Sequence, residues 1–216
     1  MRSERLEKLY RRVDRCKLCK AAGNKLHHIH GFGAGRPRWM LVLVNPTYRN
    51  LSSSTEYRGP RFPFIGVRQF WRVLADGGLI DKNTASDLPL RSAWTARHTK
   101  QLQQELIRND LFLTNLVKCC YQHSEYPKSR VLENQLPFLA EEIRIVKPKK
   151  IVAFGGLVYK VLTARSIKLS EYWTSAHSGG EVERISGLSV DVLPCYFPIG
   201  RGKPHMAAKV LRRLSQ

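Results

Sequence analysis

The pattern of apolar positions along the chain predicts strands that alternate with helices. Four short apolar runs, bounded by turn residues and rich in β-branched side chains, predict strands at 39–44, 111–117, 149–154 and 190–197. Helical spacing of apolar residues lies between and around these strands, and it predicts helices at 4–14, 67–79, 99–108, 131–146, 156–164 and 204–214. Strands that alternate with helices in this way form parallel βαβ crossovers, so the pattern indicates an α/β fold.

The composition of the strands indicates a sheet that is covered on both sides. Their apolar runs are nearly continuous, as in parallel sheets with a helical layer on each face. We therefore expect a single domain over residues 1–216, a three-layer sandwich around a central, mainly parallel four-stranded sheet. Three loops, 45–63, 120–130 and 197–204, each follow a predicted strand. Ligands bind beyond the carboxyl ends of such strands, so we expect these loops to converge on one site.

The charge of the chain narrows the choice of partner. The 216 residues include 37 Lys and Arg against 17 Asp and Glu, which gives a formal net charge of +20. Residues 1–20 carry eight basic and three acidic side chains, and residues 198–216 carry five basic and no acidic ones. A polyanion that neutralises such a surface releases counterions. DNA or RNA is therefore favoured over the alternatives, an acidic protein partner or a merely solvated basic surface.

Other features of the sequence concern location. It contains no run of about 18 apolar residues, the length that a membrane-spanning helix requires. Its first residues, MRSERLEKLYRR, lack the apolar segment of a secretory signal. We expect a soluble cytoplasmic protein that has no membrane partner and acts as a monomer.

An ordered set of motifs carries a family resemblance. The motifs are C-K-L-C (16–19), a strand that ends in N-P (45–46), P-F-I-G (63–66), T-N-L-V-K-C (114–119) and K-P-K-K-I-V-A-F-G (147–155). The set resembles the uracil-DNA glycosylase superfamily, most closely its family 4 iron–sulfur members, over roughly residues 14–213. This resemblance implies a DNA glycosylase of base excision repair, which flips a deaminated base out of DNA and hydrolyses its N-glycosidic bond. Uracil is the first candidate for that base.

The resemblance implies roles for two side chains. Phe64 matches the aromatic platform on which the flipped base stacks, and Asn115 matches the amide that reads the edge of the base. The residue types fit these roles, because every base has a face for stacking and an amide offers both a donor and an acceptor. Without the resemblance, Phe64 reads as a core residue and Asn115 as a turn or cap residue.

The chain departs from family 4 at two catalytic positions. Val44 replaces the acidic residue of G-E-A-P-G, and the next residue, Asn45, resembles the Asn of G-I-N-P-G in the mismatch-specific family 2. That likeness implies that Asn45 orients the attacking water, although Asn-Pro can equally serve only as a turn. Phe197 replaces the His of the late H-P-S motif, which in the family stabilises the departing base. An enzyme without these groups would depend on the orientation of the attacking water and on electrostatic stabilisation of the transition state.

Basic residues follow the altered late motif. We expect Arg201, Lys203 and His205 to contact DNA phosphates, and they could also bring positive charge to the leaving base. The two lost polar groups keep two alternatives open. One is a DNA-binding protein of glycosylase fold that has lost catalysis, and the other is a glycosylase for a different damaged base.

The cysteines suggest a metal site. In an intracellular protein a Cys-x2-Cys pair is more often a metal ligand than a disulfide. By resemblance, Cys16, Cys19 and Cys119 match three of the four cysteines that hold the family 4 cluster, which implies a [4Fe-4S] cluster. The fourth position matches Gln135, which is no thiolate. Replacement by Cys120 or His123, zinc in place of the cluster, and a site without metal all remain open.

Overall fold

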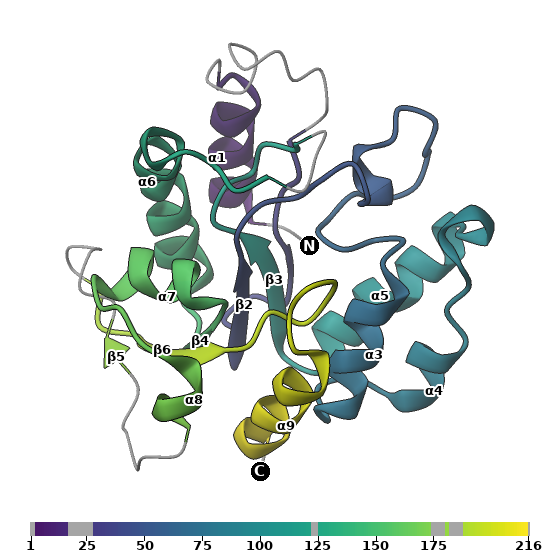
Figure 1. Ribbon diagram of the computed structural model, residues 1–216. Coiled ribbons are helices and arrows are strands. Elements are labelled where there is room, and N and C mark those ends of the chain that lie inside the picture. Colours follow the sequence, from purple (N-terminus) through teal and green to yellow (C-terminus); the bar gives the residue numbers. More distant parts are fainter. Residues whose placement is uncertain (1–2, 17–27, 122–124, 174–179, 182–187, 216) are drawn as a thin grey trace.

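A mainly parallel sheet forms the centre of the molecule (Figure 1). The computed structural model describes residues 3–16, 28–121, 125–173, 180–181 and 188–215. The strands follow the order β1-β3-β2-β4-β6-β5. The central four pair in parallel, and they are β2 (Trp39–Leu43), β3 (Leu111–Asn115), β4 (Lys150–Phe154) and β6 (Asp191–Cys195). These are the four strands that the sequence predicts, and the α/β fold class is confirmed.

Two short strands at the edges of the sheet have no counterpart among the predicted strands. β1 (Phe32–Gly33) pairs antiparallel with β3, and β5 (Gly180–Glu181) pairs antiparallel with β6. Each has only two residues, which is too short for an apolar pattern to form. Such short edge strands leave few backbone groups open for pairing with another chain.

Helices cover both faces of the sheet, as three layers require (Figure 1). One face carries α1 (Glu4–Asp14), α6 (Ser129–Val146) and α7 (Gly156–Thr163). The other face carries α3 (Arg68–Asp76), α4 (Lys82–Ser86), α5 (Ala96–Arg108) and α9 (Pro204–Ser215). The short α8 (Leu169–Tyr172) and two 3-10 turns, η1 (Leu51–Ser53) and η2 (Arg91–Ala93), complete the described elements. We refer to the two layers as the α6 face and the α3 face.

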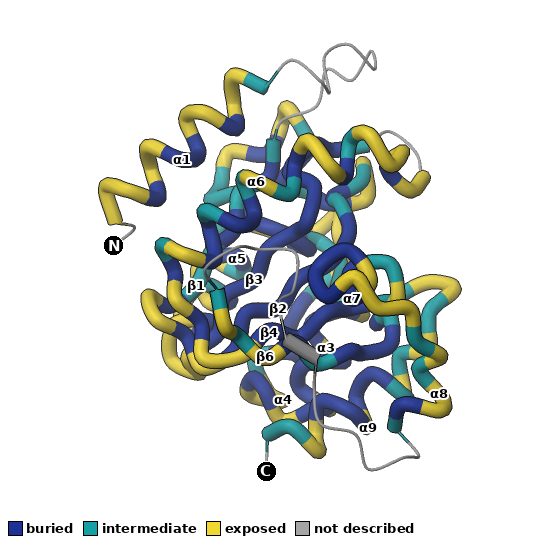
Figure 2. Tube along the Cα trace, turned by 90° about the vertical axis from the view of Figure 1, so that its left-hand side faces the viewer, coloured by how far each residue is buried: buried dark blue, intermediate teal, exposed yellow. Residues whose placement is uncertain are grey.

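Burial explains why the strands are apolar throughout. All five residues of β2 and all five of β3 are buried, and Figure 2 shows the strands as a dark interior between helices with exposed outer sides. Separate apolar clusters fill the α6 face and the α3 face. Among the described residues, no helix is long and apolar enough to cross a membrane.

The helix ends follow local sequence signals. The Ser3 side chain accepts a hydrogen bond from the backbone N–H of Leu6 and caps α1. α6 ends at Val146, and the next residue, Lys147, caps the helix in a left-handed conformation (φ 53°) directly before Pro148. Pro204 begins α9, where its fixed φ suits the first helical position.

Two of the three predicted loops meet beyond the carboxyl ends of the strands, where Tyr48 N–H donates to the Tyr121 carbonyl (2.8 Å) and Tyr121 N–H to the Pro46 carbonyl (3.0 Å). The pairing of β2 with β3 continues past the strands, because Leu116 N–H donates to the Leu43 carbonyl (2.7 Å) and Val117 N–H to the Val44 carbonyl (2.9 Å). On the α3 face, Gly200 N–H of the last loop donates to Gln69 Oε1 at the start of α3 (3.4 Å). The segments after β2, β3 and β6 therefore border one edge of the sheet.

Candidate active site

The side-chain amide of Asn115 is buried and meets no hydrogen-bond partner among the described residues. It is the last residue of β3 and is 0% exposed, and neither its Oδ1 nor its Nδ2 has a partner within the described chain. Buried polar atoms are almost always paired, and leaving one unpaired costs about 1–3 kcal/mol. An amide with both its donor and its acceptor unused suits a ligand that supplies the complementary pair.

The side chain of Asn115 lies on the α3 face of the sheet. Side chains alternate along a strand, and the Thr114 hydroxyl bonds to Glu142 of α6, on the other face. Leu113, two residues before Asn115, and Leu43, its register partner on β2, both belong to the α3-face cluster. Phe64 belongs to the same cluster, so the structure places Phe64 and Asn115 on one face.

Phe64 is held in an unusual backbone conformation. Its φ is +64°, a region that bulky residues rarely adopt, and such strain concentrates at functional sites. Its carbonyl accepts a hydrogen bond from Trp71 Nε1 (2.9 Å), and its ring stacks on Phe70 with centroids 4.3 Å apart. The side chain is only 4% exposed, so the platform that the sequence predicts is also part of the core.

The loop that carries Phe64 is fixed by polar contacts. The guanidinium of Arg61 donates to the carbonyls of Ser52, Ser54 and Tyr57. The Ser52 hydroxyl donates to the Phe62 carbonyl at 2.6 Å. These bonds tie the segment after β2 to the segment before α3, and so they fix the position of Phe64.

Asn45 lies where the loop after β2 meets the loop after β3. It is half-buried, and its Nδ2 donates to the carbonyls of Pro46 (3.2 Å) and Glu125 (3.5 Å). Within the described residues its Oδ1 accepts no hydrogen bond, which leaves this oxygen available to a water molecule. Val44, at the position of the family's acidic residue, packs into the α6-face cluster.

The last loop forms a closed turn with basic residues on its exposed side. Lys203 N–H donates to the Phe197 carbonyl (3.0 Å), and Gly202 lies so close that a Cβ there would stand 2.0 Å from that carbonyl oxygen. Phe197 is partly buried against the α3-face cluster. The predicted DNA contacts, Arg201, Lys203 and His205, are all exposed.

A comparison with protein families decides the relationship of the chain. The model of the uracil DNA glycosylase superfamily matches residues 30–214 of this sequence. The chain belongs to this superfamily.

Two relatives agree with this membership. A type-4 uracil-DNA glycosylase of Pyrobaculum aerophilum is 34% identical over 95 residues, which are 42% of this chain and 46% of that protein. A type-4 uracil-DNA glycosylase of Sulfurisphaera tokodaii is 24% identical over 193 residues, which are 89% of this chain and 74% of that protein. The first similarity therefore covers less than half of that relative's length. The resemblance that the motifs suggest is confirmed at the level of the superfamily.

The position that matches the fourth cysteine of the family 4 iron–sulfur cluster lies in a corner of the molecule beside Cys16, and in this chain it is an amide. Gln135 of α6 is 0% exposed, and its Nε2 donates to Cys16 Sγ at 3.4 Å. Its Oε1 accepts a hydrogen bond from the backbone N–H of Lys118 (3.4 Å), directly before Cys119. The structure thus places Gln135 beside Cys16 and next to the Cys119 segment, so the described residues do not fit a cluster held by four thiolates.

Cys120 does not complete that corner. Its thiol lies against Ser53 and the Tyr121 carbonyl, and burial raises its pKa to about 11. A buried, protonated thiol is a poor metal ligand. Cys19 and His123 lie outside the described residues.

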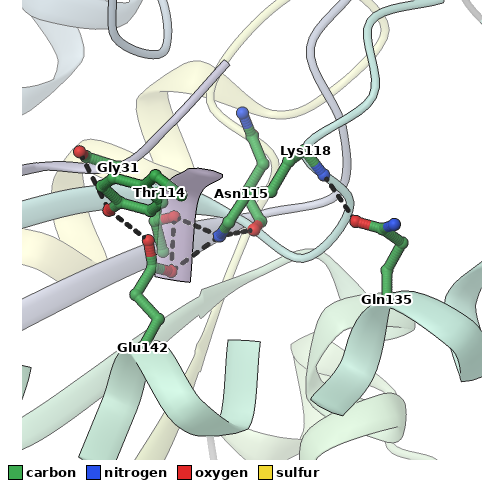
Figure 3. A network of polar contacts seen from close by, with 7 residues as sticks. Gly31, Thr114, Asn115, Lys118, Gln135 and Glu142 are labelled. Carbon is green, nitrogen blue, oxygen red and sulfur yellow. Dashed lines mark hydrogen bonds and ion pairs between the residues drawn. The ribbon is translucent and has the colours of Figure 1, made fainter. Parts of the chain in front are cut away.

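The sequence analysis missed a buried ion pair behind Asn115. Lys118 and Glu142, 1% and 0% exposed, are joined by a Nζ–Oε2 contact of 2.6 Å (Figure 3). Desolvation lowers the pKa of Lys118, and the Glu142 carboxylate opposes that shift. A signal was available, since Gln135 and Glu142 occupy the apolar stripe of α6 at helical spacing from Leu132, Leu139 and Val146.

Proposed function

We propose that this protein is a DNA glycosylase that flips uracil out of DNA and hydrolyses its N-glycosidic bond in base excision repair. The observation that carries the proposal is the buried amide of Asn115, which has both hydrogen-bonding atoms unused. Its position at the carboxyl end of a parallel strand is where α/β sheets bind ligands. Membership of the superfamily and the similarity to two type-4 uracil-DNA glycosylases support this proposal.

The proposed roles of Asn115 and Phe64 follow from the chemistry of uracil. Asn115 Oδ1 would accept the N3–H of the base, and its Nδ2 would donate to O4. Phe64 would stack on the face of the base. When the bond between C1′ and N1 breaks, its electron pair leaves on the base, and the negative charge spreads onto O4. The bond from Asn115 Nδ2 then strengthens as the charge develops, which lowers the barrier.

The attacking water needs orientation more than activation in this site. Asn45 offers Oδ1 at the junction of two loops, where it would accept a hydrogen bond from the water and direct the water oxygen at C1′. The water adds its hydroxyl group to C1′, and its remaining proton passes to solvent or to the released base. No carboxylate stands at position 44, so Asn45 would act by positioning alone.

DNA is the proposed partner. The net charge of +20 favours this partner, and the exposed Arg201, Lys203 and His205 would supply phosphate contacts. Since Phe197 cannot donate a hydrogen bond, the same basic turn would be a source of positive charge for the leaving base.

Cys119 is disulfide-bonded in the structure. We propose that, once this disulfide is reduced, Cys16, Cys19 and Cys119 hold an iron–sulfur cluster with three thiolates, as the family 4 likeness of C-K-L-C and V-K-C suggests. When bound, such a cluster would join the start of the chain to the segment after β3. A cluster is recognised by iron and acid-labile sulfide in the purified protein. Zinc without sulfide would indicate the alternative metal.

A panel of labelled oligonucleotides tests the proposed activity. Each carries one uracil, hypoxanthine, xanthine or mismatched thymine, in single-stranded and double-stranded form, and alkali cleaves any abasic site formed. We expect cleavage at uracil. Product formed only from another base would show that the protein excises that base and not uracil. Salt-dependent DNA binding without product from any base would favour the second candidate, a DNA-binding protein without catalytic activity. The apolar residues Val44 and Phe197 at two catalytic positions support that candidate.

A further inference from the structure

Lys118 lies at the centre of a buried network behind the proposed base-reading residue. Its ammonium donates to Thr114 Oγ1, to the backbone carbonyl of Asn115 and to Glu142 Oε2, each at 2.6 Å (Figure 3). An ammonium has three protons, so these three acceptors use all of them. The geometry of this nitrogen is therefore fixed on every side.

The network is anchored in three elements of the fold. Glu142 of α6 accepts hydrogen bonds from Tyr10 of α1 (2.6 Å) and from Thr114 of β3 (2.8 Å). The Tyr10 hydroxyl also lies 3.1 Å from the Gly31 carbonyl. Moving Lys118 would break its contacts to β3 and to α6 at once, and it would leave Glu142 bonded only to Tyr10 and Thr114.

The cost of this arrangement suggests a purpose other than stability. Two charges that are withdrawn from water lose several kcal/mol of solvation each, and well-packed apolar side chains often stabilise a core as well or better. The one contact that a hydrophobic pair could not reproduce near the pocket is the charge-assisted bond to the Asn115 carbonyl. That bond holds the Asn115 peptide from the α6 face while its side chain lies on the α3 face.

We propose that Lys118 is a positioning residue for Asn115. Lys118, held in place by Glu142, donates a hydrogen bond to the Asn115 carbonyl and so fixes the direction in which the Asn115 side-chain amide meets the base. Through its backbone N–H, Lys118 is also bonded to Gln135 and thus to the Cys16 corner, so one residue connects that corner to the pocket. This inference rests on the proposed function, in which Asn115 reads the base.

Three variants separate positioning from stability. Lys118→Met removes the hydrogen bond to the Asn115 carbonyl but leaves Glu142 buried without its cation, and this variant could fail to fold. Lys118→Met/Glu142→Gln removes both charges and keeps an acceptor for Tyr10. Glu105→Gln is the matched control, since Glu105 is also buried (2% exposed) and accepts bonds from Asp81 N–H and Arg108, but on α5.

The experiment measures kcat and KM for uracil excision together with affinity for uracil-free DNA. We expect the double variant to lose about 100-fold in kcat, the scale of a misplacement of about 1 Å. Its KM and its affinity for uracil-free DNA should stay within about twofold of wild type. Glu105→Gln should lower the melting temperature and leave kcat unchanged.

Two other results would overturn the inference, and they are distinguishable. A folded double variant with wild-type kcat would show that the ion pair is purely structural. The same conclusion would follow if Glu105→Gln lowered the melting temperature and kcat as much as the double variant does. Wild-type protein that releases no uracil would instead overturn the proposed function, and the inference with it.

Discussion

The backbone carbonyl of Asn115 accepts a hydrogen bond from the ammonium of Lys118 at 2.6 Å, while its side-chain amide has no partner in the part of the chain that the structure describes. One residue is thus tightly held on one face of the sheet and unsatisfied on the other. This combination is expected of a group that is preorganised for a ligand, because the fold keeps it in place before the ligand arrives.

Asn115→Ala should separate base recognition from bulk DNA binding. The variant loses the donor and the acceptor that read the base, but none of the exposed basic residues that contact phosphates. We expect affinity for an oligonucleotide with a non-cleavable uracil analogue to fall to that for the same oligonucleotide with thymine. Fluorescence anisotropy measures both affinities. Loss of affinity for both oligonucleotides by the same factor would contradict the role of Asn115.

Asn45→Ala should lower kcat more than it raises KM. Asn45 is expected to hold water and not the base, so its loss affects the chemical step. We expect kcat to fall at least about tenfold, with KM within about twofold of wild type. Single-turnover kinetics give the comparison. An unchanged single-turnover rate would reduce Asn45 to a turn residue.

The basic turn should govern the salt dependence of DNA binding. Arg201→Ala and Lys203→Ala should each reduce the slope of log K against log salt concentration by about 0.9, the contribution of one phosphate contact. Lys150→Ala is the control, because Lys150 begins β4 at the amino end of the parallel strands, away from the turn after β6, and pairs with Asp191. An equal change in slope for Lys150→Ala would indicate diffuse electrostatics and not a specific contact.

The two neighbouring cysteines should differ in their effect on metal content. Cys119→Ser should remove most of the iron, whereas Cys120→Ser should leave iron unchanged, because the Cys120 thiol lies against Ser53. Since its pKa is raised to about 11, Cys120 should stay protonated at pH 8 and resist alkylation until the protein is denatured. Mass spectrometry of labelled protein detects this. Iron loss in Cys120→Ser would place that thiol among the ligands.

Gln135→Cys should add a fourth thiolate to the cluster corner. The Gln135 amide already contacts Cys16 Sγ at 3.4 Å, so a thiol there would point toward the same ligand. We expect more iron and sulfide per chain and a slower loss of visible absorbance in air. Gln135→Ala serves as the control for the lost hydrogen bonds. Equal iron content in all three proteins would contradict the placement of Gln135 at the cluster.

The fold could be predicted from sequence because its signals are local. Each central strand is a compact apolar run, and each long helix shows one apolar stripe, so the bounds predicted for α1 coincide with the structure and those of α6 and α9 differ by no more than two residues. β1, β5 and the short helix α4 carry too few residues for such a signal. Their existence depends on the neighbours that they pack against.

The site was predictable only in part, because burial and pairing are not local. The sequence indicated that Asn115 and Phe64 share a site, but it could not show that both amide atoms of Asn115 lack partners. The place of Glu142 in the apolar stripe of α6 signals its burial, but Lys118 is 24 residues away in the sequence, and no local pattern identifies it as the partner of Glu142. Likewise, only the structure shows Cys120 at Ser53 and Gln135 at Cys16.

The most direct measurement is the free uracil that wild-type protein and Asn115→Ala release from the same single-uracil oligonucleotide, quantified by chromatography. We expect stoichiometric release by the wild type and a rate at least about 100-fold lower for Asn115→Ala. Equal rates of release from the two proteins would contradict the account, because the unpaired amide at the end of β3 would then have no part in the reaction.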